Sequence, residues 1–110
     1  EQASIPDEEI SCPILLISGQ DDQVWPASMM AKRMTKRLQQ NQFNYEFLHL
    51  DYPDAGHNFA GGGQGCGIPF LPPEDYSKGG AAKGGTVKGN ALAASQSWEA
   101  LLSFMERHLK

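Results

Sequence analysis

Two acidic residues and one histidine follow apolar segments of the sequence, at places where side chains could carry acid–base chemistry. Asp21 and Asp22 come just after Gly19, and His57 comes just after an Ala-Gly pair. A carboxylate beside an imidazole fixes the tautomer of the ring and stabilises the imidazolium that forms when the ring accepts a proton. A carboxylate in contact with His57 could therefore serve as the acid of a catalytic triad, with His57 as its general base.

The segments that must position these residues read as a strand, a helix and a second strand. Residues 13–18 are uniformly apolar, as in a parallel strand that is covered on both faces. Residues 26–40 place apolar side chains at helical spacing, and residues 45–50 predict a second strand. This order predicts parallel pairing. Because functional groups gather at the carboxyl ends of parallel strands, we expect Asp22 and His57 at one edge of the sheet.

The rest of the chain predicts a long loop and a closing helix. Residues 56–89 hold all but one of the twelve glycines. Asn90 is the expected N-cap of a helix whose apolar stripe reaches Leu109. The predicted fold class is therefore α/β, in the order β-α-β-loop-α with parallel strands. Because so small a sheet leaves an edge uncovered and the chain begins at Glu1 without a methionine, we expect either more chain before Glu1 or self-association through the exposed edge.

The composition excludes several classes of function. A formal net charge of −4 leaves no basic surplus for a nucleic-acid partner. No apolar run approaches the roughly 20 residues that span a bilayer, so no membrane span is expected. The two cysteines, Cys12 and Cys66, are too few for a disulfide scaffold and suit a reduced, cytoplasmic protein. No ligand spacing supports a metal site at Asp21, Asp22 and His57, and no cofactor is expected.

Three segments of the sequence resemble one family. The segment from Ser11 to Asp22 looks like the acid-bearing strand of the acyl-CoA thioesterase and bile acid-CoA:amino acid N-acyltransferase family. The segment from Tyr52 to His57 is similar to its histidine loop. The third segment resembles the closing helix of the family, through Gly84-Gly85, Asn90-Ala91, Trp98, Phe104 and His108-Leu109. The resemblance covers nearly the whole chain, and it implies that residues 1–110 are the C-terminal part of an α/β-hydrolase whose substrate is acyl-CoA or another thioester or ester.

By this resemblance Asp22 is the triad acid and His57 is the general base. Hydrolases commonly place the acid three residues after the glycine and four before the proline, and Asp22 has this spacing from Gly19 and Pro26. No Gly-x-Ser-x-Gly or Gly-x-Cys-x-Gly elbow occurs, and Cys66 follows His57, so we interpret it as a loop thiol. The part that carries the serine or cysteine nucleophile is therefore expected to be absent, and the chain alone to be inactive.

Several alternatives stay open. Asp21 and Asp22 could be ordinary turn residues and His57 a packing residue, which would make the chain a non-catalytic, self-associating α/β module. Another α/β-hydrolase, such as a dienelactone hydrolase, shares the same acid and histidine. Asn90 stands where mammalian members of the family often have histidine, and residues 61–67 are richer in glycine than their counterpart. Both departures leave the preferred acyl group open. The choice between hydrolysis and transfer to an amino acid depends on whether the missing nucleophile is serine or cysteine.

Overall fold

The computed structural model describes residues 5–57 and 84–109 of the chain. Its elements, in chain order, are the 3-10 turn η1 (Asp7–Glu9), strand β1 (Ile14–Gly19), helix α1 (Ala27–Gln40), strand β2 (Phe47–Tyr52) and helix α3 (Val87–His108). Most of the loop that the glycines predict, including Cys66 and residues 61–67, lies outside the described residues. No described helix is both long enough and apolar enough to cross a membrane.

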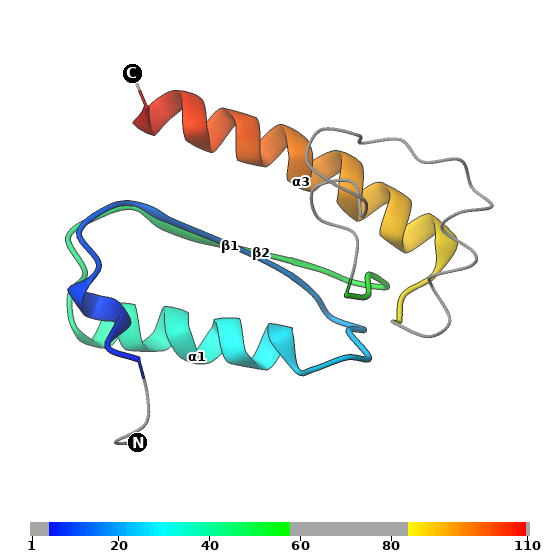
Figure 1. The fold of residues 1–110 in the computed structure, drawn as a ribbon, viewed down its shortest axis with the longest axis horizontal. Helices are drawn as coiled ribbons and strands as arrows, with labels where there is room; N and C mark the ends of the chain where they lie inside the picture. The colour runs from blue at the N-terminus through cyan, green and yellow to red at the C-terminus, as the bar shows by residue number, and fades with distance from the viewer. Residues whose placement is uncertain (1–4, 58–83, 110) are drawn as a thin grey trace.

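The two strands pair in parallel, with Ile14 opposite Phe47 at one end and Gly19 opposite Tyr52 at the other. Helix α1 connects the strands and covers one face of the sheet, and α3 lies across the opposite face (Figure 1). The α/β class, the parallel pairing and the β-α-β order that the sequence predicts are therefore confirmed. The carboxyl ends of both strands lie side by side, and the segments that follow the strands leave from there.

Two predicted boundaries were wrong. Strand β2 begins at Phe47 rather than at residue 45, because Tyr45 still belongs to the bend before the strand, where the centroid of its ring lies 5.6 Å from that of Phe43. Asn90 is not the N-cap of the closing helix. Thr86 has extended backbone and its hydroxyl oxygen accepts a hydrogen bond from the Gly89 amide, so Thr86 is the cap and Asn90 lies within the first turn.

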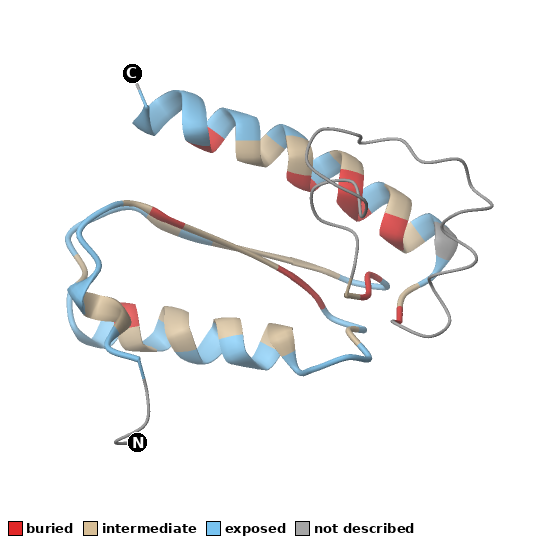
Figure 2. Cartoon of the chain, in the orientation of Figure 1, coloured by how far each residue is buried: buried red, intermediate tan, exposed pale blue. Residues whose placement is uncertain are grey.

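Small side chains let α3 approach the sheet beside the turn that follows β2. Ala55 and Ala93 are fully or almost fully buried against each other, and Ile17 and Tyr52 pack on them. The buried residues of α3 lie along the side that faces the sheet (Figure 2). The core on this face therefore joins α3 directly to the segment that carries His57.

On the other face, Leu38 of α1 is the critical apolar residue, because its side chain is completely buried. Truncation of a buried leucine to alanine removes apolar contacts and leaves a cavity, which typically costs about 2–5 kcal/mol of unfolding free energy. We expect this loss for Leu38→Ala in urea denaturation of the chain followed by circular dichroism. Met29→Ala in the same helix is the matched control, since Met29 is 53% exposed. Equal losses for the two variants would contradict the assignment of Leu38 to the core.

Candidate functional site

The loop after β1 holds the carboxylate of Asp22 in one orientation. One oxygen, Oδ1, accepts hydrogen bonds from the backbone amides of Val24, at 2.9 Å, and Trp25, at 3.2 Å. The other oxygen, Oδ2, lies 3.0 Å from Nδ1 of His57. Only 4% of the Asp22 side chain is exposed. With its two oxygens committed to different partners, the carboxylate has little freedom to turn away from the imidazole.

The ring of His57 is placed by the turn that follows β2. Its Nδ1 faces Asp22, and the Trp25 ring packs edge-on against it, with the ring centroids 5.7 Å apart. The His57 side chain is 30% exposed, so the ring borders solvent while its carboxylate partner is buried. Because a carboxylate accepts, Nδ1 carries the hydrogen in the neutral ring, and Nε2 then holds the lone pair that can take a proton.

Burial opposes ionisation of Asp22, but the hydrogen bonds from His57 and from the amides of Val24 and Trp25 outweigh it. Together they hold the pKa of the Asp22 carboxyl below its ordinary value. The residue is therefore anionic at neutral pH, as an acid that stabilises a neighbouring imidazolium must be.

Asp21, the neighbour that could have been the acid instead, points elsewhere. Its Oδ2 accepts from the Gly85 amide at 2.8 Å, and its Oδ1 accepts from the side chain of Gln23 at 2.7 Å. The structure thus brings Asp22 and His57 together and joins Asp21 to the segment that leads into α3. Asp21 serves as a tie between loops.

The acid loop and the histidine turn are in contact through their backbones. The amide of Gln20 donates to the carbonyl of Tyr52 and that of Asp21 to the carbonyl of Ala55, each at 2.9 Å. Gly19 lies at the crossing, where a Cβ atom would stand only 2.4 Å from the carbonyl oxygens of Ala55 and Gly56. A glycine is therefore required for the two segments to approach so closely.

A second set of contacts, which the sequence pattern did not reveal, holds the histidine turn from the side of α3. The side-chain oxygen of Asn90 accepts from the Gly56 amide at 2.8 Å, and its Nδ2 donates to the Gly84 carbonyl at 3.3 Å. Ala55 and Gly85 form an antiparallel bridge. The short segment before α3, residues 84–86, thus lies against the turn that presents His57.

A polar cluster beneath the acid loop was also missed. Asp51 accepts hydrogen bonds from Ser18 at 2.6 Å, from Ser28 at the start of α1 at 2.8 Å, and from Gln20 of the acid loop at 3.1 Å. Asp51 therefore joins the end of β1, the acid loop and the first turn of α1. The register of the strands, which sets Ser18 opposite Asp51, is the signal that could have found it.

Ser18 and His49 also lie within hydrogen-bond distance, with 2.7 Å between the hydroxyl oxygen and Nε2. The single hydroxyl proton of Ser18 goes to Asp51, so Nε2 of His49 must donate to the Ser18 oxygen. A histidine that donates cannot act as a base toward that serine. The trio of Ser18, His49 and Asp51 is therefore a partly buried hydrogen-bond network, and its arrangement does not activate Ser18 as a nucleophile.

No metal site is formed by the residues described, 5–57 and 84–109, because they contain no group of three His, Cys, Asp or Glu side chains placed to hold an ion. The chemistry of the site in this part of the chain is that of a carboxylate and an imidazole. Such a pair can accept a proton at Nε2 and return it, and it requires a separate group that supplies the proton.

Comparison with known proteins places the whole chain in one family. The family model described as BAAT / Acyl-CoA thioester hydrolase C terminal matches residues 1–110. The chain belongs to this family. As a member of the BAAT and acyl-CoA thioester hydrolase C-terminal family, it is 27% identical over 114 residues to Acyl-coenzyme A thioesterase 5 of Mus musculus and 27% identical over 113 residues to Acyl-coenzyme A thioesterase 6 of Homo sapiens. These alignments cover 99% and 98% of the chain but only 25% of each relative. This family member thus spans about a quarter of the length of the curated relatives it matches.

Gly19 offers a direct test of the close approach between the two loops. We expect Gly19→Ala to lower the unfolding free energy by about 1–3 kcal/mol, because the added methyl group forces apart two backbone segments that cannot yield as a flexible side chain would. Urea denaturation measures the loss. Ser103→Ala, at an exposed position of α3, is the control and should change the unfolding free energy little. A neutral Gly19→Ala variant would mean that the crossing is looser than the structure has it.

The hydrogen bonds to Asp51 predict a dependence of stability on pH. Burial raises the pKa of the Asp51 carboxyl. The hydrogen bonds from Ser18, Ser28 and Gln20 lower it by more than burial raises it, so the pKa lies below the ordinary value. A depressed carboxyl pKa stabilises the fold above the unfolded pKa, about 3.9, and this stabilisation is lost as the pH falls through the folded pKa. We expect Asp51→Asn to be less stable than the native chain by about 1–2 kcal/mol at pH 7.

This difference should shrink as the pH is lowered below about 4, because the native carboxyl is then protonated as well. Urea denaturation across the acid range measures it. Asp54→Asn is the control, since Asp54 is exposed and asparagine tolerates its left-handed backbone, φ 57°. A difference for Asp51→Asn that stays constant with pH would show that the charge of Asp51 contributes nothing.

Proposed function

We propose that this chain supplies the acid and the general base of a catalytic triad in a thioester hydrolase with the α/β-hydrolase fold. Asp22 is the acid and His57 is the base, and the nucleophile comes from a part of the parent protein outside residues 1–110. The observation that carries the proposal is the 3.0 Å contact between Nδ1 of His57 and the buried carboxylate of Asp22, which leaves Nε2 to accept a proton. The thioesterase relatives support acyl-CoA as the substrate.

The reaction follows the usual order of acyl transfer. The upstream serine attacks the thioester carbonyl while Nε2 of His57 takes the hydroxyl proton, and Asp22 stabilises the imidazolium. The tetrahedral intermediate then expels the coenzyme A thiolate, which receives the proton from His57, and the acyl group remains on the serine. A water molecule attacks this ester as His57 takes its proton. Collapse releases the carboxylic acid and returns the proton to the serine.

A cysteine in place of the serine would leave the roles of Asp22 and His57 unchanged. The acyl group could then pass to the amine of an amino acid instead of to water, because the same base would take the proton of the attacking amine. Asp22 and His57 therefore have the same roles whether the acceptor is water or an amine. The identity of the nucleophile in the parent gene decides between serine and cysteine.

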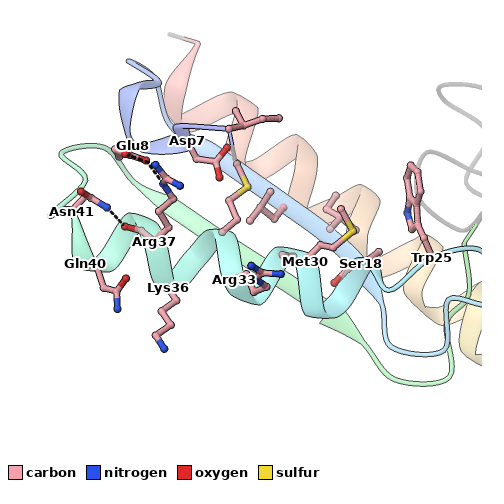
Figure 3. A pocket seen from close by; sticks show the side chains of 16 residues that line it. Asp7, Glu8, Ser18, Trp25, Met30, Arg33, Lys36, Arg37, Gln40 and Asn41 are labelled. Carbon is pink, nitrogen blue, oxygen red and sulfur yellow. Dashed lines mark hydrogen bonds and ion pairs between the residues drawn. The ribbon is translucent and has the colours of Figure 1, made fainter. Parts of the chain in front are cut away.

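Among the described residues β1 pairs with β2 alone, and its other edge supports the proposal that more of a hydrolase domain packs here. A groove of about 1080 Å³ runs between α1 and β1, lined by residues of β1 but by none of β2. The ion pair of Glu8 and Arg37 lies toward one end, and Trp25 lies at the other (Figure 3). Trp25 and Met30 beside it are both more than half exposed. We propose that a neighbouring strand of the parent domain pairs with this edge.

Self-association is the alternative explanation for the exposed edge of β1. Two copies of the chain could pair along β1 and cover the exposed methionines without any catalytic role for Asp22 or His57. This alternative belongs to a different class of function, because a non-catalytic module needs no nucleophile. Loss or retention of activity on removal of the base separates the two readings.

Removal of the base in the intact parent protein tests the proposal. We expect His57→Ala to lower kcat for hydrolysis of acetyl-, octanoyl- or palmitoyl-CoA, whichever is turned over, on the order of 1,000-fold, because the nucleophile loses its proton acceptor. Release of the coenzyme A thiol measures the rate. His108→Ala is the matched control, since His108 lies at the far end of α3 and contacts Glu46.

Near-native kinetics of folded His57→Ala would contradict the catalytic role and favour the non-catalytic module. The purified 110-residue chain should give no turnover by itself. Turnover by that chain would contradict the placement of the nucleophile elsewhere, and it would direct attention to Cys66.

A further inference from the structure

We propose that Asn90 is a positioning residue for His57, in that its buried carboxamide fixes the peptide that carries the imidazole. The inference rests on the proposed role of His57 as the general base. The printed hydrogen bonds of the Asn90 side chain go to backbone groups, and Asn90 lies in the first turn of α3, an element separate from the loops that carry Asp22 and His57. Its influence passes through Gly56, the residue directly before His57.

Both ends of the Asn90 carboxamide are used, and they are not interchangeable. Oδ1 accepts from the Gly56 amide at 2.8 Å, and Nδ2 donates to the Gly84 carbonyl at 3.3 Å. Rotation of the carboxamide by half a turn would set donor against donor and acceptor against acceptor. Only 6% of Asn90 is exposed, so water has little access to replace either hydrogen bond. The Gly56 peptide therefore has one preferred orientation.

The surroundings of Asn90 are built to the shape of its side chain. Gly85 has φ +82°, and a Cβ atom there would lie 2.5 Å from Oδ1 of Asn90. The absence of that carbon lets the segment before α3 close over the carboxamide. Ala93, one turn further along α3, is buried against Ala55 of the histidine turn. Asn90 thus acts from a helix that is itself seated on the turn (Figure 1).

The fold does not depend on Asn90 alone. A role in orienting His57 can therefore be distinguished from a role in holding the histidine turn in place. The Thr86 amide still donates to the Asp54 carbonyl at 2.9 Å, and the bridge between Ala55 and Gly85 uses backbone groups only. These contacts hold the turn in place without the carboxamide. Loss of Asn90 frees the Gly56 peptide, and with it the direction of the His57 ring, while the rest of the turn stays attached.

Such a change acts on the rate of proton transfer more than on substrate binding. A shift of about 1 Å in a catalytic group can lower the rate about 100-fold. Asn90→Leu keeps a side chain of similar size and removes both hydrogen bonds. We expect it to lower kcat of the intact parent protein about 10- to 100-fold and to change KM less than threefold. The midpoint of the pH–rate profile should also move, because the contact of His57 with Asp22 is altered.

The assay uses the acyl-CoA ester that the intact protein hydrolyses, with rates expressed per folded protein from circular dichroism. Asn90→Ala accompanies Asn90→Leu, so that one variant remains if leucine does not fit. Ser97→Ala is the matched control, because Ser97 is also a buried polar residue of α3, and within the described part of the chain its hydroxyl donates to the carbonyl of Ala94 in the same helix. The control should keep native kcat, KM and pH midpoint.

His57→Ala measured alongside separates the two proposals. If His57→Ala is inactive while both Asn90 variants keep native kcat and pH profile, the positioning role is wrong and the proposed function stands. If His57→Ala is active, the proposed function fails first. A loss in the Asn90 variants that is confined to the amount of folded protein, with an unchanged pH midpoint, would also overturn the inference, since it would mark a purely structural role.

Discussion

The hydrogen bond between His57 and Asp22 is the contact around which the rest of the described structure is arranged. The two residues are 35 positions apart, and 3.0 Å separates their side chains only because β1 and β2 run parallel and end at the same edge. An antiparallel pairing would have sent the following loops to opposite edges. The helix between the strands, α1, is what permits the parallel return, and its packing on the sheet is therefore a condition for the contact.

Approach of the strand ends is not sufficient, since each loop must also present its side chain in the right direction. The acid loop does this locally, because backbone amides of its own residues bind Asp22. The histidine turn does it through distant residues, because Asn90 and the bridge at Gly85 come from beyond the intervening loop. Gly19 sets the distance between the two segments. The acid is thus fixed by short-range contacts, and the base by contacts across 30 or more residues.

This difference explains how much could be predicted from the sequence. The apolar run of β1, the helical spacing of α1 and the order of the two loops depend on neighbouring residues, so they were predictable, as was the meeting of Asp22 with His57. The cluster around Asp51 depends on the register of the strands, and the hydrogen bonds of Asn90 depend on how α3 packs on the sheet. Local sequence patterns encode neither. For this reason the prediction that Asn90 caps the closing helix is wrong. It is a residue type that caps helices, as is Thr86, and only tertiary contacts decide which of the two is the cap.

The same contacts determine which elements on each face of the sheet hold the acid loop and the histidine turn. Beneath the sheet, Asp51 ties the acid loop to α1; above it, α3 holds the histidine turn. The acid loop is therefore held to α1 through Asp51 and to the segment before α3 through Asp21, while the histidine turn is held by α3, and all of these contacts are made by the described residues. If the proposed triad is correct, the acid and the base are preorganised before the nucleophile is in place, which lowers the cost of reorganisation during proton transfer. In the proposed function, the nucleophile and the donors for the oxyanion come from outside residues 1–110, and the edge of β1 that no described strand pairs with is where we propose that this part packs.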